Sequence, residues 1–212
     1  MSRGAVDAPE PERSGGEPRR SERVPGGGTE REQSRRHLVL IGLMGAGKTT
    51  VGRRCAEALD RPFVDTDDLI VAQAGATVTE IFATEGEKAF RAREHAALAD
   101  AIASPEPLVI ACGGGAMVDV ENRRAVRDTG FVVWLACAPD ELAARVERDG
   151  TASRPLLAAG PTAATLTRLE GLRAGTYEQA ADARVPTDGH DVAAVTRSVL
   201  AAYRGACEGT MP

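Results

Sequence analysis

Eight consecutive residues carry the clearest chemistry of this chain, the segment Gly42-Leu43-Met44-Gly45-Ala46-Gly47-Lys48-Thr49. The segment matches the phosphate-binding pattern G-x-x-x-x-G-K-[ST], between an apolar strand pattern and a helical pattern, as that loop requires. Backbone N–H groups of such a loop surround an anion, the helix N-terminus adds its positive dipole end, and the Thr hydroxyl binds Mg²⁺. The nucleotide contacts that we expect are Gly45, Ala46, Gly47, Lys48, Thr49 and Thr50.

Lysine is rare in the chain, since only Lys48 and Lys88 are lysines among 26 basic residues. Genome composition is an alternative explanation of this scarcity. A lysine at the motif position, in a chain that otherwise uses arginine, nevertheless indicates that a compact ammonium charge is required there. Lys88 lies in a charged helical pattern, and we interpret it as part of a solvated face.

Two carboxylates, Asp65 and Asp67, stand at the end of the apolar segment 62–67, which we predict to be a strand. Open parallel sheets bind ligands at the carboxyl ends of their strands. One carboxylate there can hold Mg²⁺ through water while the other meets a hydroxyl nucleophile, because phosphoryl transfer depends on a positioned acceptor. The alternative is a pair of helix-capping residues.

Three glycines, Gly113-Gly114-Gly115, follow another apolar segment, 107–112. Consecutive glycines are entropically costly, and we expect close approach of a ligand to the bare backbone, with a simple loop as the alternative. This strand has no terminal Asp, so Asp65 must supply the carboxylate for Mg²⁺. Four arginines also stand out by context for binding phosphate or carboxylate groups, although each has a surface ion pair as its alternative: Arg91, Arg148, Arg154 and Arg173.

Strand and helix patterns alternate along the chain and predict a parallel sheet covered on both faces. The predicted strands are residues 37–42, 62–67, 107–112, 131–137 and 184–187. The predicted helices are residues 49–59, 68–74, 78–84, 87–103, 118–128, 139–147, 162–181 and 192–203. A polar segment, 148–161, interrupts this alternation, and we expect it to close over bound nucleotide as a lid.

Residues 1–36 contain no Leu, Ile or aromatic residue, and 15 of them are charged. Such a segment buries too little apolar surface to offset its ordering entropy, so we predict a disordered tail. The globular domain is expected over residues 37–205, followed by a short tail, 206–212.

The formal net charge of −5 and the absence of a long basic run argue against nucleic-acid binding. No segment has the apolar length of a membrane span or of a signal peptide, so we expect a cytoplasmic protein with no membrane partner. Four widely spaced cysteines without a C-x-x-C pattern indicate reduced thiols. The sequence does not determine the oligomeric state, and we expect a monomer.

Seven segments in this order resemble the shikimate kinases over essentially all of residues 37–205. They are GLMGAGKTTVGR (42–53), FVDTDDLI (63–70), EIFATEGEKAFRAREHAAL (80–98), VIACGGGA (109–116), VVWLACAPDELAARV (132–146), SRPLL (153–157) and R-x-x-x-Y (173–177). The resemblance implies a P-loop NTPase fold of the nucleoside-monophosphate-kinase type, an α/β architecture with a five-stranded parallel sheet in the order 2-3-1-4-5, flanking helices and a lid. It also implies transfer of the ATP γ-phosphate to the 3-hydroxyl of shikimate, with Mg²⁺, in the route to chorismate and aromatic amino acids.

The resemblance further implies roles for single residues on the nucleotide side. Lys48 is the catalytic lysine on the phosphates, Thr49 is the Mg²⁺ ligand, and Asp65 is its water-mediated partner. Arg154 is the lid arginine that reaches ATP and the transferring phosphate. Arg148 corresponds to another nucleotide-side arginine if the lid lacks one residue, and adenine is expected near residues 184–190.

On the acceptor side, the resemblance implies that Asp67 contacts the reacting hydroxyl and acts as the base. Arg91 and Arg173 then bind the shikimate carboxylate, and Gly114 contacts the substrate through its backbone, with Gly113 and Gly115 beside it.

Two departures from the family pattern concern the acceptor. The chain has Ala174-Gly175-Thr176 where many members have x-Pro-Leu, and Ile70-Val71 where many have Ile-Glu. Gly and Thr are expected to loosen the segment that carries Arg173, which leaves a kinase for another small polyol acid, of the gluconate or aminoshikimate type, as an alternative. A non-catalytic nucleotide-binding protein is the alternative of a different class, and the retention of Lys48 and Asp67 argues against it.

Overall fold

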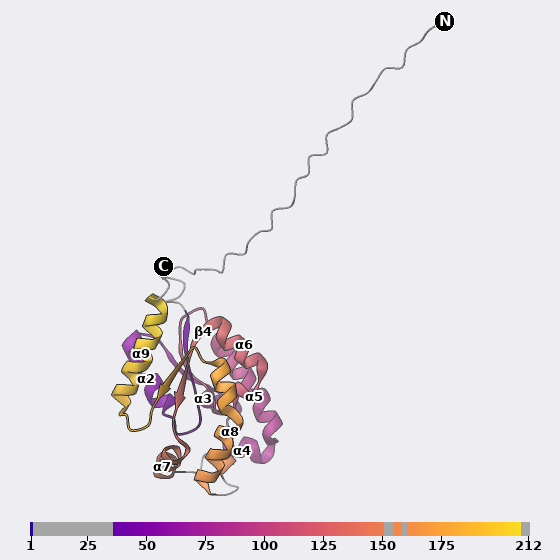
Figure 1. The fold of residues 1–212 in the computed structure, drawn as a ribbon. Helices are drawn as coiled ribbons and strands as arrows, with labels where there is room; N and C mark the ends of the chain where they lie inside the picture. The colour runs from indigo at the N-terminus through magenta and orange to yellow at the C-terminus, as the bar shows by residue number, and fades with distance from the viewer. Residues whose placement is uncertain (2–35, 151–154, 158–160, 209–212) are drawn as a thin grey trace.

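Five parallel strands form the central sheet in the order β2-β3-β1-β4-β5 (Figure 1). Their bounds are β1 His37–Ile41, β2 Phe63–Asp65, β3 Val109–Ala111, β4 Gly130–Ala136 and β5 Ala183–Pro186. β1 lies at the centre of the sheet, where Leu38 is in register with Val109 of β3 and Phe131 of β4. The strand order and direction confirm the fold predicted from the sequence.

This computed structural model describes residue 1 and residues 36–150, 155–157 and 161–208. The predicted disorder of the N-terminal tail therefore lies almost entirely outside the described residues. Arg154, half of the predicted lid and residues 209–212 also lie outside the described residues. Figure 1 shows these segments as a thin grey trace.

Helices cover both faces of the sheet (Figure 1). On one face α2 (Lys48–Leu59) packs against α9 (Val192–Glu208), which continues beyond the predicted domain boundary at residue 205. On the other face α6 (Val120–Thr129) and α8 (Thr162–Ala180) pack against β4, and α5 (Gly86–Ile102) packs against α6. α7 (Pro139–Asp149) follows β4 and packs against α8, and proline is favourable at its first position because no intrahelical N–H is lost.

Two separate apolar clusters stabilise these elements. The larger cluster surrounds the sheet, whose central strands are buried along their whole length, as parallel strands covered on both faces require. The smaller cluster consists of Ile70, Ile81, Phe90 and Ala97. It joins α3 (Thr66–Ala74), α4 (Val78–Thr84) and α5, so that these three helices form a unit with its own core beside the edge of the sheet.

Two predicted elements differ from the structure near the carboxylates and the glycines. The second strand ends at Asp65 rather than residue 67, because the Asp65 side chain accepts a hydrogen bond from the Asp67 N–H and caps α3. Asp67 therefore lies in the first turn of a helix. After the glycines a short 3₁₀ helix, η1 (Ala116–Val118), precedes α6, which begins at Val120 because Asp119 caps it. A second short 3₁₀ helix, η2, comprises Pro155–Leu157.

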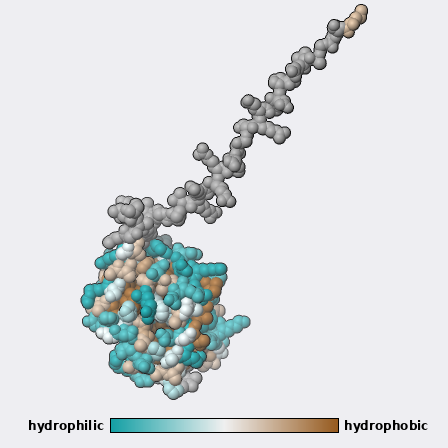
Figure 2. All heavy atoms as spheres, in the orientation of Figure 1, coloured by the Kyte–Doolittle hydropathy of each residue, from teal (hydrophilic) through white to brown (hydrophobic). Residues whose placement is uncertain are grey.

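The surface is largely hydrophilic on the face shown in Figure 2, with scattered apolar patches. In the described part of the chain, no helix combines the length and apolar character that a membrane crossing needs. All four cysteines are free thiols, as predicted, and three of them are buried. Burial raises the pKa of the Cys55 thiol to about 12, which keeps it protonated and unreactive.

Candidate active site

The phosphate-binding loop connects β1 to α2 as the motif predicts. Gly47 has a φ of 92°, a conformation that favours glycine, and it precedes the first residue of α2, Lys48. No side chain caps this helix and its first turn carries no acidic residue, so the N-terminal N–H groups are not neutralised by the protein's own carboxylates. The Lys48 ammonium donates to the carbonyls of Gly42 (2.9 Å) and Leu43 (3.0 Å), which hold it over the loop.

The predicted Mg²⁺ residues are in direct contact. The Thr49 hydroxyl donates to Asp65 Oδ2 at 2.7 Å, while Asp65 Oδ1 accepts from the Asp67 N–H at 3.0 Å. The Asp65 side chain therefore caps α3 and also lies beside the phosphate-binding loop, so the two alternatives given for it from the sequence are compatible. A hydroxyl and a carboxylate are hard oxygen donors that fit Mg²⁺, which usually keeps its waters and binds substrate phosphates as well. The described residues contain no cluster of three or more His, Cys, Asp or Glu side chains that could hold a metal by itself.

A hollow beside the loop is formed by three segments that are far apart in the sequence. It is lined by the phosphate-binding loop and α2, by α7 and by the connection from β5 to α9. Arg148 lines it from α7, and Thr187 and His190 line it from the segment where adenine is expected. Arg145, which the sequence did not single out, pairs with Glu141 (3.0 Å) and donates to the Thr187 carbonyl (2.8 Å), and so joins α7 to that segment.

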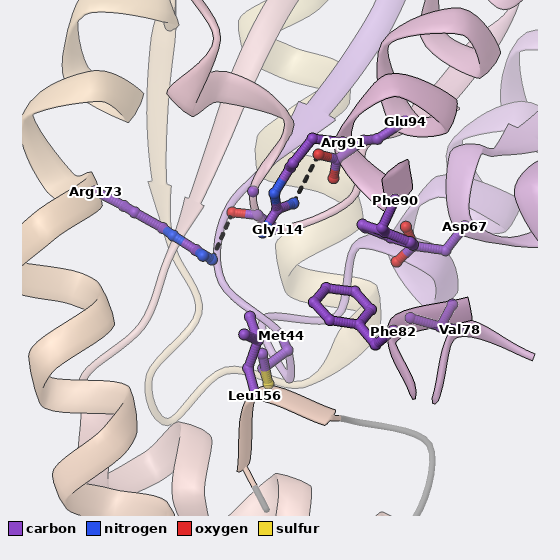
Figure 3. A pocket seen from close by; sticks show the side chains of 11 residues that line it. Met44, Asp67, Val78, Phe82, Phe90, Arg91, Glu94, Gly114, Leu156 and Arg173 are labelled. Carbon is purple, nitrogen blue, oxygen red and sulfur yellow. Dashed lines mark hydrogen bonds and ion pairs between the residues drawn. The ribbon is translucent and has the colours of Figure 1, made fainter. Parts of the chain in front are cut away.

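A second hollow lies on the other side of the loop and contains the predicted acceptor residues (Figure 3). Asp67, Arg91, Gly114 and Arg173 all line it, although they come from four separate parts of the chain. We call it the acceptor hollow. Gly115, which the sequence predicts beside Gly114, also lines it. No role was predicted from the sequence for the remaining lining residues, which are Met44, Val78, Phe82, Phe90, Glu94 and Leu156.

Asp67 presents one carboxylate oxygen that nothing in the described structure satisfies. Its Oδ1 is buried and has no hydrogen-bond donor. Burial, reinforced by the neighbouring charge of Asp65, raises the pKa of the Asp67 carboxyl to about 6, while Lys48 and Arg91 act in the opposite direction. An unsatisfied buried acceptor of this kind is suited to a donor from a ligand.

Glu94 is the main residue of the hollow that sequence reasoning missed. Its side chain is 2% exposed, its Oε2 accepts from Arg91 Nη1 at 2.7 Å, and its Oε1 is buried without a donor among the described residues. Arg91 also pairs with Glu87 at 3.0 Å. Glu94 lies three residues after Arg91 on a predicted helix, and this spacing could have predicted the ion pair. The burial of Glu94 could not be predicted in this way, because it depends on the tertiary fold.

Arg173 is a buried cation that forms no ion pair with a described carboxylate, although the charge of Glu94 is near enough to interact with it. It is 7% exposed, and its Nη1 donates to the Gly114 carbonyl at 3.0 Å. One helical turn further along α8, the Tyr177 hydroxyl donates to the same carbonyl at 2.5 Å. Figure 3 shows Arg173 and Arg91 extending toward Gly114 from opposite sides.

Each of the three glycines lies against a charged side chain of the hollow. A Cβ on Gly113 would stand 2.5 Å from Glu94 Oε1 and 2.7 Å from Asp67 Oδ1. A Cβ on Gly115 would collide with the Arg91 guanidinium, and one on Gly114 would stand 3.8 Å from Arg173 Nη1. The protein's own carboxylates and arginine therefore require a bare backbone at Gly113 and Gly115, whereas the contacts at Gly114 are of ordinary van der Waals length. The ligand approach predicted from the sequence stays a prediction.

The departure at Gly175 and Thr176 does not interrupt the helix that carries Arg173. α8 runs unbroken from Thr162 to Ala180, and the Thr176 hydroxyl donates to the Arg173 carbonyl at 2.7 Å. Lys88 is exposed on α5, in agreement with its interpretation as part of a solvated face.

Comparison with known proteins assigns the chain to a family. The sequence model of the family "Shikimate kinase" matches residues 44–204. A shikimate kinase from Symbiobacterium thermophilum is 48% identical over 164 residues, which are 77% of this chain and 94% of that protein. The structure of an Acinetobacter baumannii shikimate kinase in complex with shikimate superposes with a TM-score of 0.78 at 33% identity, over 86% of this chain and 99% of that one.

A gluconokinase from Sinorhizobium meliloti is a more distant structural neighbour. It superposes with a TM-score of 0.53 at 20% identity, over 82% of this chain and 95% of that one. At this identity the likeness concerns the fold alone.

Proposed function

This chain belongs to the shikimate kinase family and carries out ATP-dependent phosphorylation of shikimate, and we propose that its two hollows hold the two substrates on either side of the phosphate-binding loop. The hollow beside α7 and α9 then binds ATP. The acceptor hollow binds shikimate, with its carboxylate between Arg91 and Arg173 and its 3-hydroxyl at Asp67.

The buried guanidinium of Arg173 is the observation that carries this assignment. Burying a cation that no carboxylate contacts directly is costly, and an anionic ligand that contacts it relieves that cost when it binds. Arg91 lies across Gly114 from Arg173, so a planar carboxylate placed there would receive charge-assisted hydrogen bonds from both. Asp67 lines the same hollow, which supports a ligand that has both a carboxylate and hydroxyl groups.

The chemistry proposed at Asp67 follows from its free oxygen. Phosphoryl transfer requires a hydroxyl that is aligned with the γ-phosphate and a group that accepts its proton. Asp67 Oδ1 is buried, has no described donor and lies beside the loop that bears Lys48, so we assign it this hydroxyl and its proton. A carboxyl with a pKa near 6 is mostly ionised at neutral pH and is a stronger base than an ordinary Asp.

On the nucleotide side, we propose that Lys48 turns from the Gly42 and Leu43 carbonyls to the β- and γ-phosphates. Arg148 lines the same hollow and is assigned to ATP, and Arg154 is assigned to the transferring phosphate by the family resemblance. Thr49 and Asp65 would hold Mg²⁺, the first directly and the second through water. When bound, Mg²⁺ neutralises the charge that the phosphate oxygens carry.

We further propose a kinase domain over residues 37–208, three residues longer than the sequence predicts because α9 continues to Glu208, with tails at 1–36 and 209–212. We propose that it acts as a monomer in the cytoplasm without nucleic-acid or membrane partners. The net charge of −5 supports the absence of a nucleic-acid partner. The use of ATP and the four free thiols support the location, because reduced cysteines are typical of the cytosol.

A comparison of two arginine variants on α8 tests the acceptor assignment. Arg173→Ala removes the buried cation, and Arg168→Ala removes an exposed arginine from the same helix as a matched control. Loss of a charge-assisted contact should raise the KM for shikimate roughly tenfold to a hundredfold in Arg173→Ala. ADP release, followed in a coupled assay with shikimate, gluconate and an aminoshikimate as acceptors, gives the KM for each.

The control should retain the wild-type KM, and neither variant should change the KM for ATP by more than about twofold, since neither residue lines the nucleotide hollow. A defect of Arg173→Ala confined to ATP would contradict the carboxylate assignment. A higher kcat/KM for gluconate or aminoshikimate than for shikimate would identify that acid as the acceptor in place of shikimate. Nucleotide binding without turnover of any acceptor would favour a non-catalytic protein.

A further inference from the structure

We propose that Tyr177 is a positioning residue, which fixes the middle of the glycine loop between Arg91 and Arg173 and so sets the spacing at which the two guanidinium groups meet the acceptor carboxylate. The proposal rests on the proposed function of the acceptor hollow. It concerns a buried phenol that reaches the hollow only through the backbone, since Tyr177 is absent from its lining.

The hydroxyl of Tyr177 and the guanidinium of Arg173 converge on one acceptor. The distances to the Gly114 carbonyl oxygen are 2.5 Å from Tyr177 Oη and 3.0 Å from Arg173 Nη1. A carbonyl oxygen has two lone pairs, so these two donors satisfy it. Burial raises the pKa of the Tyr177 phenol to about 12, and the hydroxyl therefore remains a donor at any physiological pH.

Tyr177 is itself held rigidly against the sheet. The residue is 1% exposed, and its ring packs at 5.8 Å, centroid to centroid, on that of Trp134 in β4. Arg184 of β5 stacks on the Trp134 ring with its guanidinium carbon 5.0 Å from the ring centroid. The phenol hydroxyl therefore fixes the glycine loop relative to the sheet. Arg173 alone is not expected to do so, because its guanidinium is also proposed to bind the ligand.

The peptide group that Tyr177 fixes is the one that separates the two arginines. The Gly114 carbonyl and the Gly115 N–H belong to one planar unit, so holding the oxygen toward α8 also directs the N–H away from it. The next Cα, that of Gly115, lies against the Arg91 guanidinium. A rotation of this plane would therefore move the contact surfaces of both arginines together.

Other anchors hold the glycine loop on either side of its central peptide group, the one between Gly114 and Gly115. The Gly113 carbonyl accepts from the Ala116 N–H at 3.1 Å, and the Gly115 carbonyl accepts from the Val118 N–H at 2.9 Å. The Gly113 N–H donates to the Thr66 hydroxyl at 2.9 Å, and Asn122 Nδ2 donates to the Ala116 carbonyl at 2.9 Å. Between them the backbone consists of glycine, which has the greatest conformational freedom of any residue. Apart from Arg173, the Tyr177 hydroxyl is the donor that the described structure provides for the central peptide group.

Tyr177→Phe tests the proposal by removing one oxygen atom, and Tyr203→Phe is a matched control. Tyr203 is the only other tyrosine of the chain, is 3% exposed, and donates to the Arg36 carbonyl at 2.9 Å, on α9 across the sheet from α8. Loss of one hydrogen bond should raise the KM for shikimate and its calorimetric Kd in Tyr177→Phe by roughly threefold to tenfold. The kcat and the KM for ATP should change less than twofold, because the carboxylate contact is made equally in the ground and transition states.

Thermal unfolding of both variants separates positioning from simple stability. Both lose a buried hydroxyl, so both should have a lower Tm, whereas only Tyr177→Phe should bind shikimate more weakly. A lower Tm with an unchanged KM for shikimate in Tyr177→Phe would overturn the proposal. An equal KM increase in Tyr203→Phe would also overturn it, since any loss of stability would then produce the effect.

The double variant Arg173→Ala/Tyr177→Phe tests whether Tyr177 acts through the arginine clamp. If it does, Tyr177→Phe should add less than twofold to the KM of Arg173→Ala, a non-additive result expected for residues in one contact network. Independent, multiplicative effects would contradict the mechanism. Wild-type turnover is measured first, because a wild-type enzyme inactive on shikimate would refute the proposed function, whereas an active one with a normal Tyr177→Phe refutes only this inference.

Discussion

The two sides of the phosphate-binding loop are built in different ways. On the proposed nucleotide side, most of the phosphate contacts are expected from one contiguous segment, 42–50, whose backbone N–H groups would bind the anion. On the acceptor side, the charged groups come from α3, α5 and α8 around the glycine loop, and the position of each depends on its neighbours in space. The cavity volumes are about 420 Å³ beside α7 and about 100 Å³ in the acceptor hollow, so the larger of the two lies where the larger ligand is proposed to bind.

This contrast indicates which parts of the fold determine phosphate binding and which determine acceptor binding. A contiguous loop tolerates change elsewhere in the fold, because its geometry depends mainly on its own glycines and the helix that follows. A dispersed site depends on contacts such as that between Gly115 and Arg91, and changes in any of several elements should alter it. The two sides should therefore be separable by kinetics, with acceptor-side variants changing shikimate parameters and leaving the KM for ATP intact.

The largest effect is expected from Asp67→Asn. An amide of the same shape cannot accept the hydroxyl proton, so kcat should fall by a factor on the order of 10² to 10⁴, the usual scale for a positioned acid–base group. Steady-state assays at saturating ATP and shikimate measure this change. Asp68→Asn is the control, because Asp68 is exposed on the same turn. Its ion pair with the exposed Arg53 is long, at 3.7 Å, and its loss should have little effect. Wild-type kcat in Asp67→Asn would remove this carboxylate from the mechanism.

The next effect is expected from Gly115→Ala, which changes the acceptor side without altering any charged residue. Gly115 has a φ of −103°, which alanine adopts without strain, so the added methyl group acts only by displacing the Arg91 guanidinium. Displacement of a charge-assisted contact should raise the KM for shikimate roughly tenfold to a hundredfold, with the KM for ATP unchanged. Gly171→Ala, on α8 with no heavy atom within 4 Å of its Cβ, should leave both constants unchanged.

The same contrast explains how much the sequence could predict. The loop and the residues Asp67 and Gly114 were within reach because a motif and the ends of strands carry them. The sheet order and the acceptor roles of Arg91 and Arg173 were expected only from the family resemblance. The predicted second strand ran to residue 67, because the sequence left open whether the two carboxylates bind a ligand or cap a helix, and the Asp65 side chain in fact caps α3, which begins at Thr66. The buried, half-satisfied carboxylate of Glu94 and the contact of Tyr177 with Gly114 depend on pairs of residues more than 15 positions apart, which periodicity does not encode.

The smallest effect is expected from Gly175→Ala, which tests whether the departure from the family pattern weakens the acceptor side. Gly175 is exposed in the interior of α8, two residues after Arg173, and a Cβ there meets open space. Alanine should stabilise the helix by about 0.5–1 kcal/mol, since it loses less backbone entropy on folding. Thermal unfolding should therefore give a Tm higher by a few degrees, as roughly 1 kcal/mol shifts the Tm of a domain of this size by about 2–4 °C. Because the Gly114 carbonyl already holds Arg173, the KM for shikimate should stay within about twofold of wild type, a change below the scale of one hydrogen bond. A markedly lower KM in the stiffened helix would show instead that the glycine keeps the clamp loose in the native enzyme.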